Sequence, residues 1–219
     1  MLAACIFDLD GVLTDTAKFH YLAWKEVAQH FNYNLTEEDN EKLKGVSRLD
    51  SLLLMLEWAN TTLSETEINR LLEIKNQHYL VLIEDMSASD VFDGVLGLFK
   101  SLKDNKVKIA LGSSSKNALT ILNRLEISHW FDAISDGNNV IKSKPDPEVF
   151  LYAAEKMHVN PADCLVFEDA PAGVQAALNA NMSCIGIGDQ SVLSGAHICL
   201  PDLKELNYNK LIAMPQINL

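Results

Sequence analysis

Short apolar runs alternate with helix-like segments along most of the chain. The runs cover residues 3–7, 107–111, 133–135, 164–167 and 184–187. Each is apolar almost throughout, which is typical of strands buried on both faces of a parallel sheet, and amphipathic stretches of helical period separate them. The pattern therefore predicts a three-layer α/β core in which helices cover a mainly parallel sheet.

One long region breaks this alternation. From about residue 17 to residue 83, apolar positions recur at helical spacing and no strand-like run appears. The apolar positions form three stripes: Phe19, Leu22, Ala23, Val27 and Phe31; Leu52, Leu53, Leu56 and Ala59; and Ile68, Leu71, Leu72 and Tyr79, with Lys75 inside the last stripe. We therefore expect an all-helical cap, residues 15–87, inserted into an α/β core made of residues 1–14 and 88–219.

The chain passes between these two parts twice, near residues 14–16 and near residues 85–90. Two crossings at one place form a hinge. Ligands of open α/β sheets bind beyond the carboxyl ends of the strands, and the cap leaves the core at that edge. The cap is therefore positioned to act as a lid over a ligand.

Several helix starts are marked by residues that suit helix N-termini. Ser64 with Glu67 fits a capping box. Asp146 followed by Pro147 fits an N-cap carboxylate and a proline at the first helical position, and Pro171 stands near another start.

Composition and charge narrow the class of protein. With 48% hydrophobic and 22% charged residues, the chain is typical of globular proteins rather than disordered ones. Its formal net charge of −12 excludes duplex nucleic acid and anionic membranes as expected partners, since both bind cationic surfaces. No stretch reaches the roughly 18 apolar residues of a membrane span, and the start lacks the basic residues of a signal peptide.

The four cysteines, Cys5, Cys164, Cys184 and Cys199, lie far apart in the sequence, which favours free thiols in a reducing compartment. We expect a cytoplasmic, monomeric protein.

Two pairs of acidic residues follow two of the predicted strands. Asp8 and Asp10 come directly after the first strand, with Gly11 allowing a sharp turn, and Glu168 and Asp169 follow the run 164–167. Carboxylates that meet at one sheet edge need a cation between them, and oxygen ligands alone suit Mg²⁺. The alternative is a set of acidic loop caps without a metal.

Residues that suit phosphate follow another predicted strand. The segment 112–117 opens a helix with small hydroxyl residues, and backbone N–H groups at a helix N-terminus attract anions. Lys144 stands just before a further helix, where a cation gains nothing from the helix dipole. We interpret Lys144 as a phosphate neighbour; a solvated loop lysine is the alternative.

These segments together resemble the four ordered motifs of the haloacid dehalogenase superfamily of phosphotransferases. The matching residues are Asp8, Asp10, Ser113, Lys144, Glu168 and Asp169. The resemblance implies a Rossmann-like core, a phosphoryl-accepting nucleophile at Asp8 and a general acid and base at Asp10. It also implies that Ser113 and Lys144 hold phosphoryl oxygens, and that Mg²⁺ is bound by Asp8, the Asp10 backbone carbonyl, Glu168 and Asp169.

The predicted cap is similar to that of the β-phosphoglucomutase family. The residues that carry this likeness, with their core-side neighbours, are Thr16, His20, Trp24, Gly45, Val46, Ser47, Arg48, Ser51, Lys75, Asn76, Ser114, Ser115, Lys116 and Asn117. The family interconverts β-D-glucose 1-phosphate and glucose 6-phosphate through an aspartyl phosphate and β-glucose 1,6-bisphosphate, which also activates it. A mutase must hold two phosphates, and the resemblance implies that Arg48 helps to bind the distal one.

The same resemblance implies that Thr16, His20 and Lys75 form a relay that moves Asp10 into place. By themselves, His20 and Trp24 are also consistent with packing roles, and Lys75 with a lysine whose stem lies along apolar surface. Ser114 departs from the family's loop, in which an alanine is common. The alternative functions are a sugar-phosphate phosphatase of the same superfamily and a catalytically silent phosphosugar-binding regulator; the presence of both Asp8 and Asp10 argues against the latter.

Overall fold

The computed structural model describes residues 2–217 and has a six-stranded, fully parallel sheet. The strands are β1 (Ala4–Phe7), β2 (Lys108–Gly112), β3 (Ala133–Ser135), β4 (Cys164–Glu168), β5 (Ser183–Ile187) and β6 (Ile198–Leu200). Their spatial order is β3-β2-β1-β4-β5-β6, which is the doubly wound order of Rossmann-like folds. The order reverses beside β1, so the carboxyl ends of β1, β2 and β4 are adjacent.

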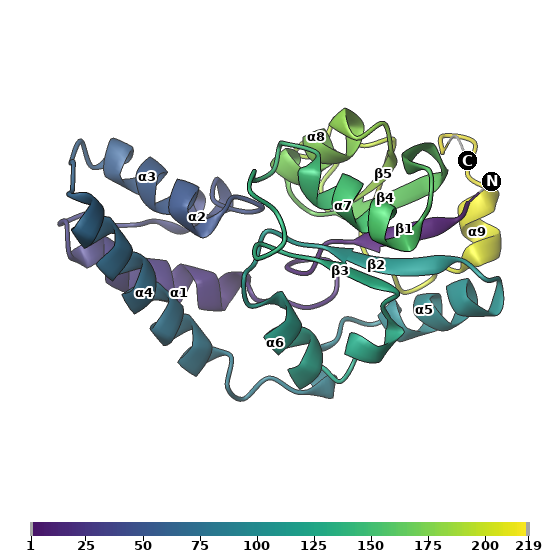
Figure 1. Cartoon of the computed structure of the whole chain (residues 1–219), viewed down its shortest axis with the longest axis horizontal. Helices are drawn as coiled ribbons and strands as arrows, with labels where there is room; N and C mark the ends of the chain where they lie inside the picture. Colours follow the sequence, from purple (N-terminus) through teal and green to yellow (C-terminus); the bar gives the residue numbers. More distant parts are fainter. Residues whose placement is uncertain (1, 218–219) are drawn as a thin grey trace.

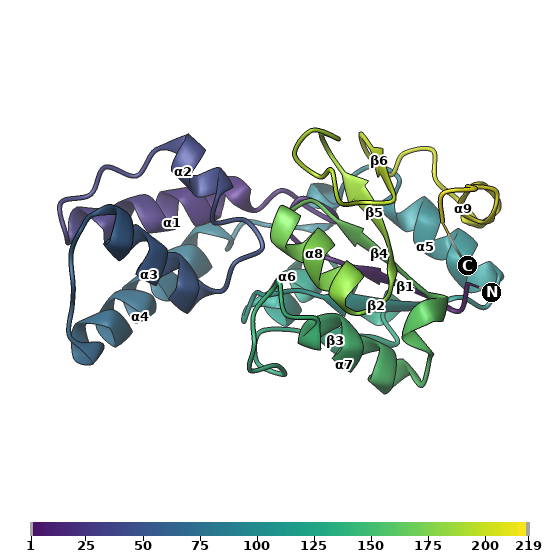
Figure 2. The ribbon, with the colours of Figure 1, turned by 90° about the horizontal axis from the view of Figure 1, so that it is seen from above.

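Helices cover both faces of the sheet (Figures 1 and 2). They are α5 (Val95–Asp104), α6 (Ala118–Arg124) and α9 (Tyr208–Ile212) on one face, and α7 (Glu148–Met157) and α8 (Pro171–Asn179) on the other. Alternate residues of β1 supply the two cores: Cys5 and Phe7 pack with α5, whereas Ala4 and Ile6 pack with α7 and α8. The predicted three-layer α/β core is confirmed.

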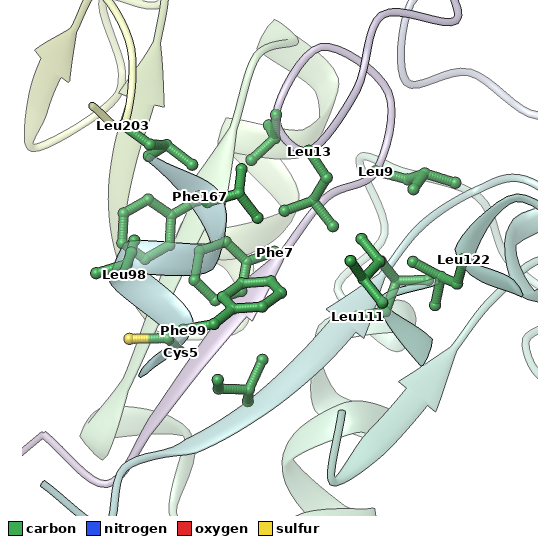
Figure 3. Close-up of a cluster of buried hydrophobic side chains, with 14 of the residues drawn as sticks. Cys5, Phe7, Leu9, Leu13, Leu98, Phe99, Leu111, Leu122, Phe167 and Leu203 are labelled. Carbon is green, nitrogen blue, oxygen red and sulfur yellow. The ribbon is translucent and has the colours of Figure 1, made fainter. Parts of the chain in front are cut away.

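Aromatic rings contribute to the larger of the two hydrophobic cores, the one between the sheet and α5 (Figure 3). The rings of Phe7 and Phe167, on the paired strands β1 and β4, stack with centroids 4.5 Å apart. Phe99 of α5 meets Phe7 edge-on at 5.0 Å. These contacts fix the ends of β1 and β4 relative to each other, immediately before the acidic residues that follow both strands.

The cap region contains α1 (Ala17–Gln29), α2 (Glu37–Glu41), α3 (Arg48–Trp58) and α4 (Glu65–Leu82), and no strand lies between α1 and α4 in the described chain. Most residues of the three stripes pack in the hydrophobic cluster of the cap, and Phe19, Ala23 and Tyr79 pack in or against the larger cluster of the core. Two other stripe residues, Leu22 and Leu53, are exposed. Each lies at the border of its stripe, where an apolar residue is tolerated at the surface. The boundaries 15–87 remain a prediction.

The two crossing segments pair with each other. Thr14 forms an antiparallel bridge with Val91, and its hydroxyl donates to the Asp90 carbonyl at 2.8 Å. The Phe92 N–H donates to the Leu13 carbonyl at 2.9 Å. The segment around 88–90 forms a short 3-10 helix, Ala88–Asp90, and two more such turns, Ser128–Trp130 and Pro161–Asp163, connect core elements. The two crossing segments, which form the predicted hinge, are therefore joined by hydrogen bonds although neither belongs to a strand of the sheet.

Most of the helix starts predicted from capping residues and prolines are confirmed. Ser64 and Glu67 form the predicted capping box, and Pro171 occupies the first turn of α8. Pro147, however, is the N-cap of α7 rather than its first residue, while the Asp146 carboxylate accepts from the Glu148 N–H at 3.0 Å. The strand β6 was missed: its three residues are only half-buried, and no helix separates it from β5, so the alternation of strand-like and helix-like segments does not mark it. No helix among residues 2–217 is long and apolar enough to cross a membrane.

Candidate active site

Two carboxylates and one lysine meet where β1 and β4 end. Asp8 follows β1, Glu168 ends β4, and Lys144 enters from the segment before α7. The Lys144 Nζ lies 2.8 Å from an Asp8 carboxylate oxygen and forms a second, shorter ion pair with Glu168. The side chains of Lys144 and Glu168 are 0% exposed, so Lys144 is not a solvated loop lysine.

Burial and charge work against each other in this cluster. Burial alone would lower the pKa of Lys144, but Asp8 and Glu168 raise it above its ordinary value, and Lys144 stays charged. Burial raises the pKa of Glu168 to about 7, against the opposing effect of Lys144. Burial and the neighbouring carboxylates of Glu168 and Asp8 also raise the pKa of Asp169. Lys144 alone therefore does not balance the charge of the three carboxyl groups of Asp8, Glu168 and Asp169.

The carboxylates suit a hard divalent cation. One oxygen each of Asp8, Glu168 and Asp169 lies within 4.8 Å of the others, and oxygen is the donor atom that Mg²⁺ prefers. Gly11 makes room for this arrangement, because a Cβ there would lie 2.1 Å from an Asp169 carboxylate oxygen. The donor set and the shortage of positive charge both fit such an ion. The Asp10 backbone carbonyl remains the predicted additional ligand.

Asp10 is held by the cap rather than by the core. Thr16, the N-cap residue of α1, makes no side-chain capping bond and instead donates its hydroxyl to an Asp10 carboxylate oxygen. The His20 Nε2 lies 3.9 Å from the same oxygen. Burial and the charge of Asp8 raise the pKa of Asp10 to about 6, although the Thr16 bond opposes the shift. The pKa of the Asp10 carboxyl group therefore lies close to neutral pH, which suits a group that donates and accepts protons.

The buried Lys75 determines which ring nitrogen of His20 accepts a hydrogen bond and adds to the effect of burial in lowering the pKa of the ring. The Lys75 Nζ lies 2.8 Å from His20 Nδ1, so Nδ1 accepts from the ammonium and the ring proton is assigned to Nε2, on the side of Asp10. Burial, followed by the charges of Lys75 and Arg48, holds the pKa of His20 well below its usual value. The ring also packs on Tyr79 with centroids 4.3 Å apart. The packing role and the polar role of His20 therefore coexist.

A loop of small residues follows β2. Ser115 N–H donates to Ser113 Oγ at 3.1 Å, and Asn117 N–H donates to Ser115 Oγ at 3.2 Å. Two of the N–H groups expected to face an anion are therefore used inside the loop. Ser113 itself is completely buried, and its N–H donates to the Ser135 carbonyl of β3 at 3.0 Å.

The sequence did not reveal the support that this loop receives from the turn after β3. The Asn138 Nδ2 donates to the Lys116 carbonyl at 2.9 Å, and a Cβ on Gly137 would lie 2.6 Å from the Ser114 carbonyl oxygen. Asp136 accepts from the Asn138 N–H at 2.8 Å and shapes the turn. The run Asp136-Gly137-Asn138 was a visible turn signal. Its contact partner, however, was not visible in the sequence.

Core and cap together enclose a cavity of about 580 Å³. Most predicted site residues line it: Asp8, Asp10, His20, Trp24, Gly45, Val46, Ser47, Arg48, Ser51, Lys75, Ser114, Ser115, Lys116, Asn117, Lys144 and Asp169. Thr16, Asn76, Ser113 and Glu168 lie behind the wall and contact it: Asn76, for example, accepts from Asn117 Nδ2 at 2.9 Å. Asn40, which is buried and also lines the cavity, was not predicted.

Two predicted cap residues also have structural tasks. The Ser47 side chain is the N-cap of α3 and accepts from the Asp50 N–H at 3.2 Å, which positions the helix that begins with Arg48. Trp24 is 2% exposed and belongs to the hydrophobic core of the cap, while the Lys75 Nζ lies 5.0 Å from its ring centroid. Trp24 therefore packs within the cap and lines the cavity at the same time.

The fold and the acidic edge define a known class of protein. A family model described as haloacid dehalogenase-like hydrolase matches residues 2–181, and the chain belongs to that family. A β-phosphoglucomutase of Bacillus subtilis is 41% identical over 212 residues, covering 96% of this chain and 94% of the relative. The predicted resemblance to the β-phosphoglucomutases is confirmed.

Two further relatives mark the range of the family. A β-phosphoglucomutase structure from Clostridium difficile superimposes with a TM-score of 0.94 at 41% identity, covering 97% of this chain and 96% of the other. A phosphorylated carbohydrates phosphatase of Thermotoga maritima is 32% identical over 187 residues, covering 84% of each chain. Mutases and phosphatases therefore both stand among the relatives.

Proposed function

We propose that this chain is a Mg²⁺-dependent β-phosphoglucomutase that interconverts β-D-glucose 1-phosphate and D-glucose 6-phosphate. The observation that carries the proposal is that one cavity is lined at the sheet edge by Asp8 and Asp10 and on the cap side by Arg48. A phosphatase requires only the first of these ends, whereas a mutase must hold a second phosphate. The identity to a β-phosphoglucomutase over nearly the whole chain supports the same assignment.

Asp8 is the proposed nucleophile. One of its carboxylate oxygens attacks phosphorus, the bond from phosphorus to the sugar oxygen breaks, and the phosphoryl group stays on Asp8 as an aspartyl phosphate. Asp10 donates a proton to the leaving oxygen and removes a proton from the incoming hydroxyl in the reverse direction. Transfer from the 1-position of β-glucose 1,6-bisphosphate leaves glucose 6-phosphate, and transfer to the free 6-hydroxyl of glucose 1-phosphate regenerates the bisphosphate.

Charge neutralisation is the other requirement of phosphoryl transfer. Lys144, charged and 2.8 Å from Asp8, is placed to bind a transferring phosphoryl oxygen together with Ser113. When bound at Asp8, Glu168, Asp169 and the Asp10 carbonyl, Mg²⁺ supplies positive charge to the phosphoryl oxygens. These assignments rest on the buried ion pairs and the acidic cluster at the ends of β1 and β4.

The distal phosphate is assigned to the cap side. Arg48 offers a planar fork of donors that suits phosphate, and Ser115, Lys116 and Asn117 line the same cavity from the core. Binding across the two parts favours a closed cap, which keeps water from the aspartyl phosphate. Thr16, His20 and Lys75 connect the cap to Asp10, so we assign them to positioning the general acid and base.

A coupled assay tests this function. Purified protein, Mg²⁺, β-glucose 1-phosphate and a trace of β-glucose 1,6-bisphosphate are followed for glucose 6-phosphate and for free phosphate. Glucose 6-phosphate forming well in excess of free phosphate is the expected result. Free phosphate in excess would overturn the mutase assignment, and the absence of both products would favour the catalytically silent binding protein.

A sugar-phosphate phosphatase of the same superfamily is the second candidate, favoured by the 32% identity to a phosphorylated carbohydrates phosphatase. It would use Asp8, Asp10 and the metal in the same way, with water as the final phosphoryl acceptor. The two candidates differ in their need for Arg48. Cytoplasmic location and the monomeric state remain predictions from the sequence.

A further inference from the structure

The cap touches the core through a short turn between α2 and α3, here called the docking turn, residues 44–47. Its Gly45 carbonyl accepts a hydrogen bond of 2.9 Å from the hydroxyl of Ser114, which lies 69 positions away in the loop after β2. Gly45 has a left-handed backbone with φ of +73°, and a Cβ there would lie 3.1 Å from the Ala170 Cβ. The turn therefore approaches the core closely at two of its loops.

Ser114 occupies a position that no other hydroxyl in its loop shares. Ser113 Oγ and Ser115 Oγ both accept backbone N–H groups of their own loop, at 3.1 and 3.2 Å. The Ser114 hydroxyl instead crosses the boundary to the cap. The hydrogen bond from Ser114 to Gly45 forms without a substrate, because both of its partners belong to the protein.

The hydrogen bond from Ser114 to Gly45 links the loop that lines the core side of the cavity to the turn that precedes Arg48 on the cap side. On the core side, Ser114 stands between the serines assigned to the phosphoryl groups. On the cap side, Gly45 precedes Arg48 by three residues, and Ser47 caps the helix that Arg48 begins. A hydrogen bond at Gly45 therefore restrains the position of Arg48 relative to the anion loop.

We propose that the Ser114 hydroxyl is a positioning group that stabilises the closed cap by hydrogen bonding to the Gly45 carbonyl. Its effect on the reaction rests on the proposed mutase function: a cap that stays closed shields the aspartyl phosphate from water. One neutral hydrogen bond changes an equilibrium constant by about two- to tenfold, so loss of the hydroxyl shifts the ratio of closed to open cap by that factor.

Distances between two spin labels test the conformational part. Labels are attached to cysteines introduced at the exposed positions Glu57, in α3 of the cap, and Glu155, in α7 of the core. Figure 1 shows that these two helices belong to different parts of the molecule. Cys199, which is only partly buried, is replaced by serine, and the other native cysteines are buried. Ser114→Ala is expected to increase the population of long distances in the substrate-free protein by about two- to tenfold.

Two variants control this experiment. Ser114→Thr keeps a hydroxyl and is expected to restore the distances of the parent protein. Ser194→Ala removes a hydroxyl from an exposed loop of the core and is expected to leave them unchanged. Unchanged distances in Ser114→Ala, or equal losses in the Ala and Thr variants, would overturn the proposal.

The reaction provides a second readout. In the coupled assay, Ser114→Ala is expected to raise the ratio of free phosphate to glucose 6-phosphate by about two- to tenfold, and Ser114→Thr to restore it. If the label distances respond but the parent chain forms no glucose 6-phosphate, the proposed function fails and the hydrogen-bonded restraint stands. If the parent chain is a mutase and the distances do not respond, the restraint fails and the function stands.

Discussion

The two sides of the cavity are built in different ways. On the core side, Asp8, Lys144 and Glu168 are buried at strand ends and already hold one another by ion pairs. On the cap side, Arg48 stands at the start of a helix that reaches the core through a turn, with Ser114 bonded to Gly45. The groups proposed to bind the transferring phosphoryl group therefore belong to the core. The group proposed to recognise a second phosphate belongs to the cap and depends on the position of the cap relative to the core.

Under the proposed function, the cap side decides between mutase and phosphatase chemistry. Changes on the core side should affect every phosphoryl transfer alike, because Asp8 is the proposed nucleophile in both. Changes on the cap side should alter the fate of the phosphoryl group more than its removal from a substrate. The predictions below would break the comparison if core and cap variants behaved alike.

The largest effect is expected for Asp8→Asn. An amide is a far weaker nucleophile than a carboxylate, so both glucose 6-phosphate and free phosphate should fall by about 10⁴-fold or more. The coupled assay measures both products, and circular dichroism with thermal unfolding checks that the variant is folded. Retention of substantial activity would show that the nucleophile is a different group.

Lys144→Met should combine a loss of activity with a loss of stability. Removing the ammonium leaves the carboxylates of Asp8 and Glu168 buried without a cation to balance them, which typically costs about 3–5 kcal/mol. Urea unfolding measures the cost, and added Mg²⁺ should restore part of it. Lys100→Met, at an exposed pair with Asp104, should cost no more than about 0.5 kcal/mol. Equal costs in both variants would contradict the buried ion pairs.

Arg48→Ala should separate the two chemistries. Loss of a donor that binds the distal phosphate is expected to lower mutase turnover by about 10²-fold, while hydrolysis of a small phosphate ester changes by only a few-fold. Arg48→Lys keeps the charge without the planar fork and should fall between the two. A parallel loss of both activities in Arg48→Ala would mean that the cap residue acts at the transfer site.

The last prediction concerns the pH dependence of stability rather than activity. Burial lowers the pKa of Lys75 to about 7 from an ordinary value of 10.5. Between these values the unfolded chain binds more protons than the folded one, so the free energy of unfolding contributed by Lys75 rises with pH. Lys75→Met removes this rise, and any stability advantage of that variant near pH 7 should shrink towards pH 10. The exposed Lys18→Met variant should track the parent protein across the same urea-unfolding series.

Much of the core side could be predicted from the sequence. The apolar runs marked five of the six strands, and acidic residues directly after two of them indicated the sheet edge where they would meet. Continuous apolar runs, and the acidic residues that directly follow them, are local features of the sequence and require no knowledge of distant contacts. The strand β6 was missed because no helix separates it from β5, so the alternation on which the prediction rested does not mark it.

The cap side was predicted less completely from its residues. The stripe of α4 placed Lys75 among apolar residues, where only its stem was expected to lie along apolar surface; it did not indicate that the Nζ would lie 2.8 Å from His20 Nδ1. Only the family resemblance connected Thr16 with Asp10; the residues alone did not indicate that its hydroxyl would donate to Asp10 instead of capping its own helix. Such contacts depend on the relative placement of two helices and a strand end, which periodicity does not specify.

The sequence by itself determined the order of strands and helices, the place of the helical insert and the acidic residues at strand ends, because each is a property of neighbouring residues. Only the tertiary structure decided that Lys144 pairs with Asp8 across 136 positions, and that Ser114 meets Gly45 across 69. Strand order and the docking of the cap bring these groups together. Their energies arise from burial and short-range contact, which exist only once the chain has folded.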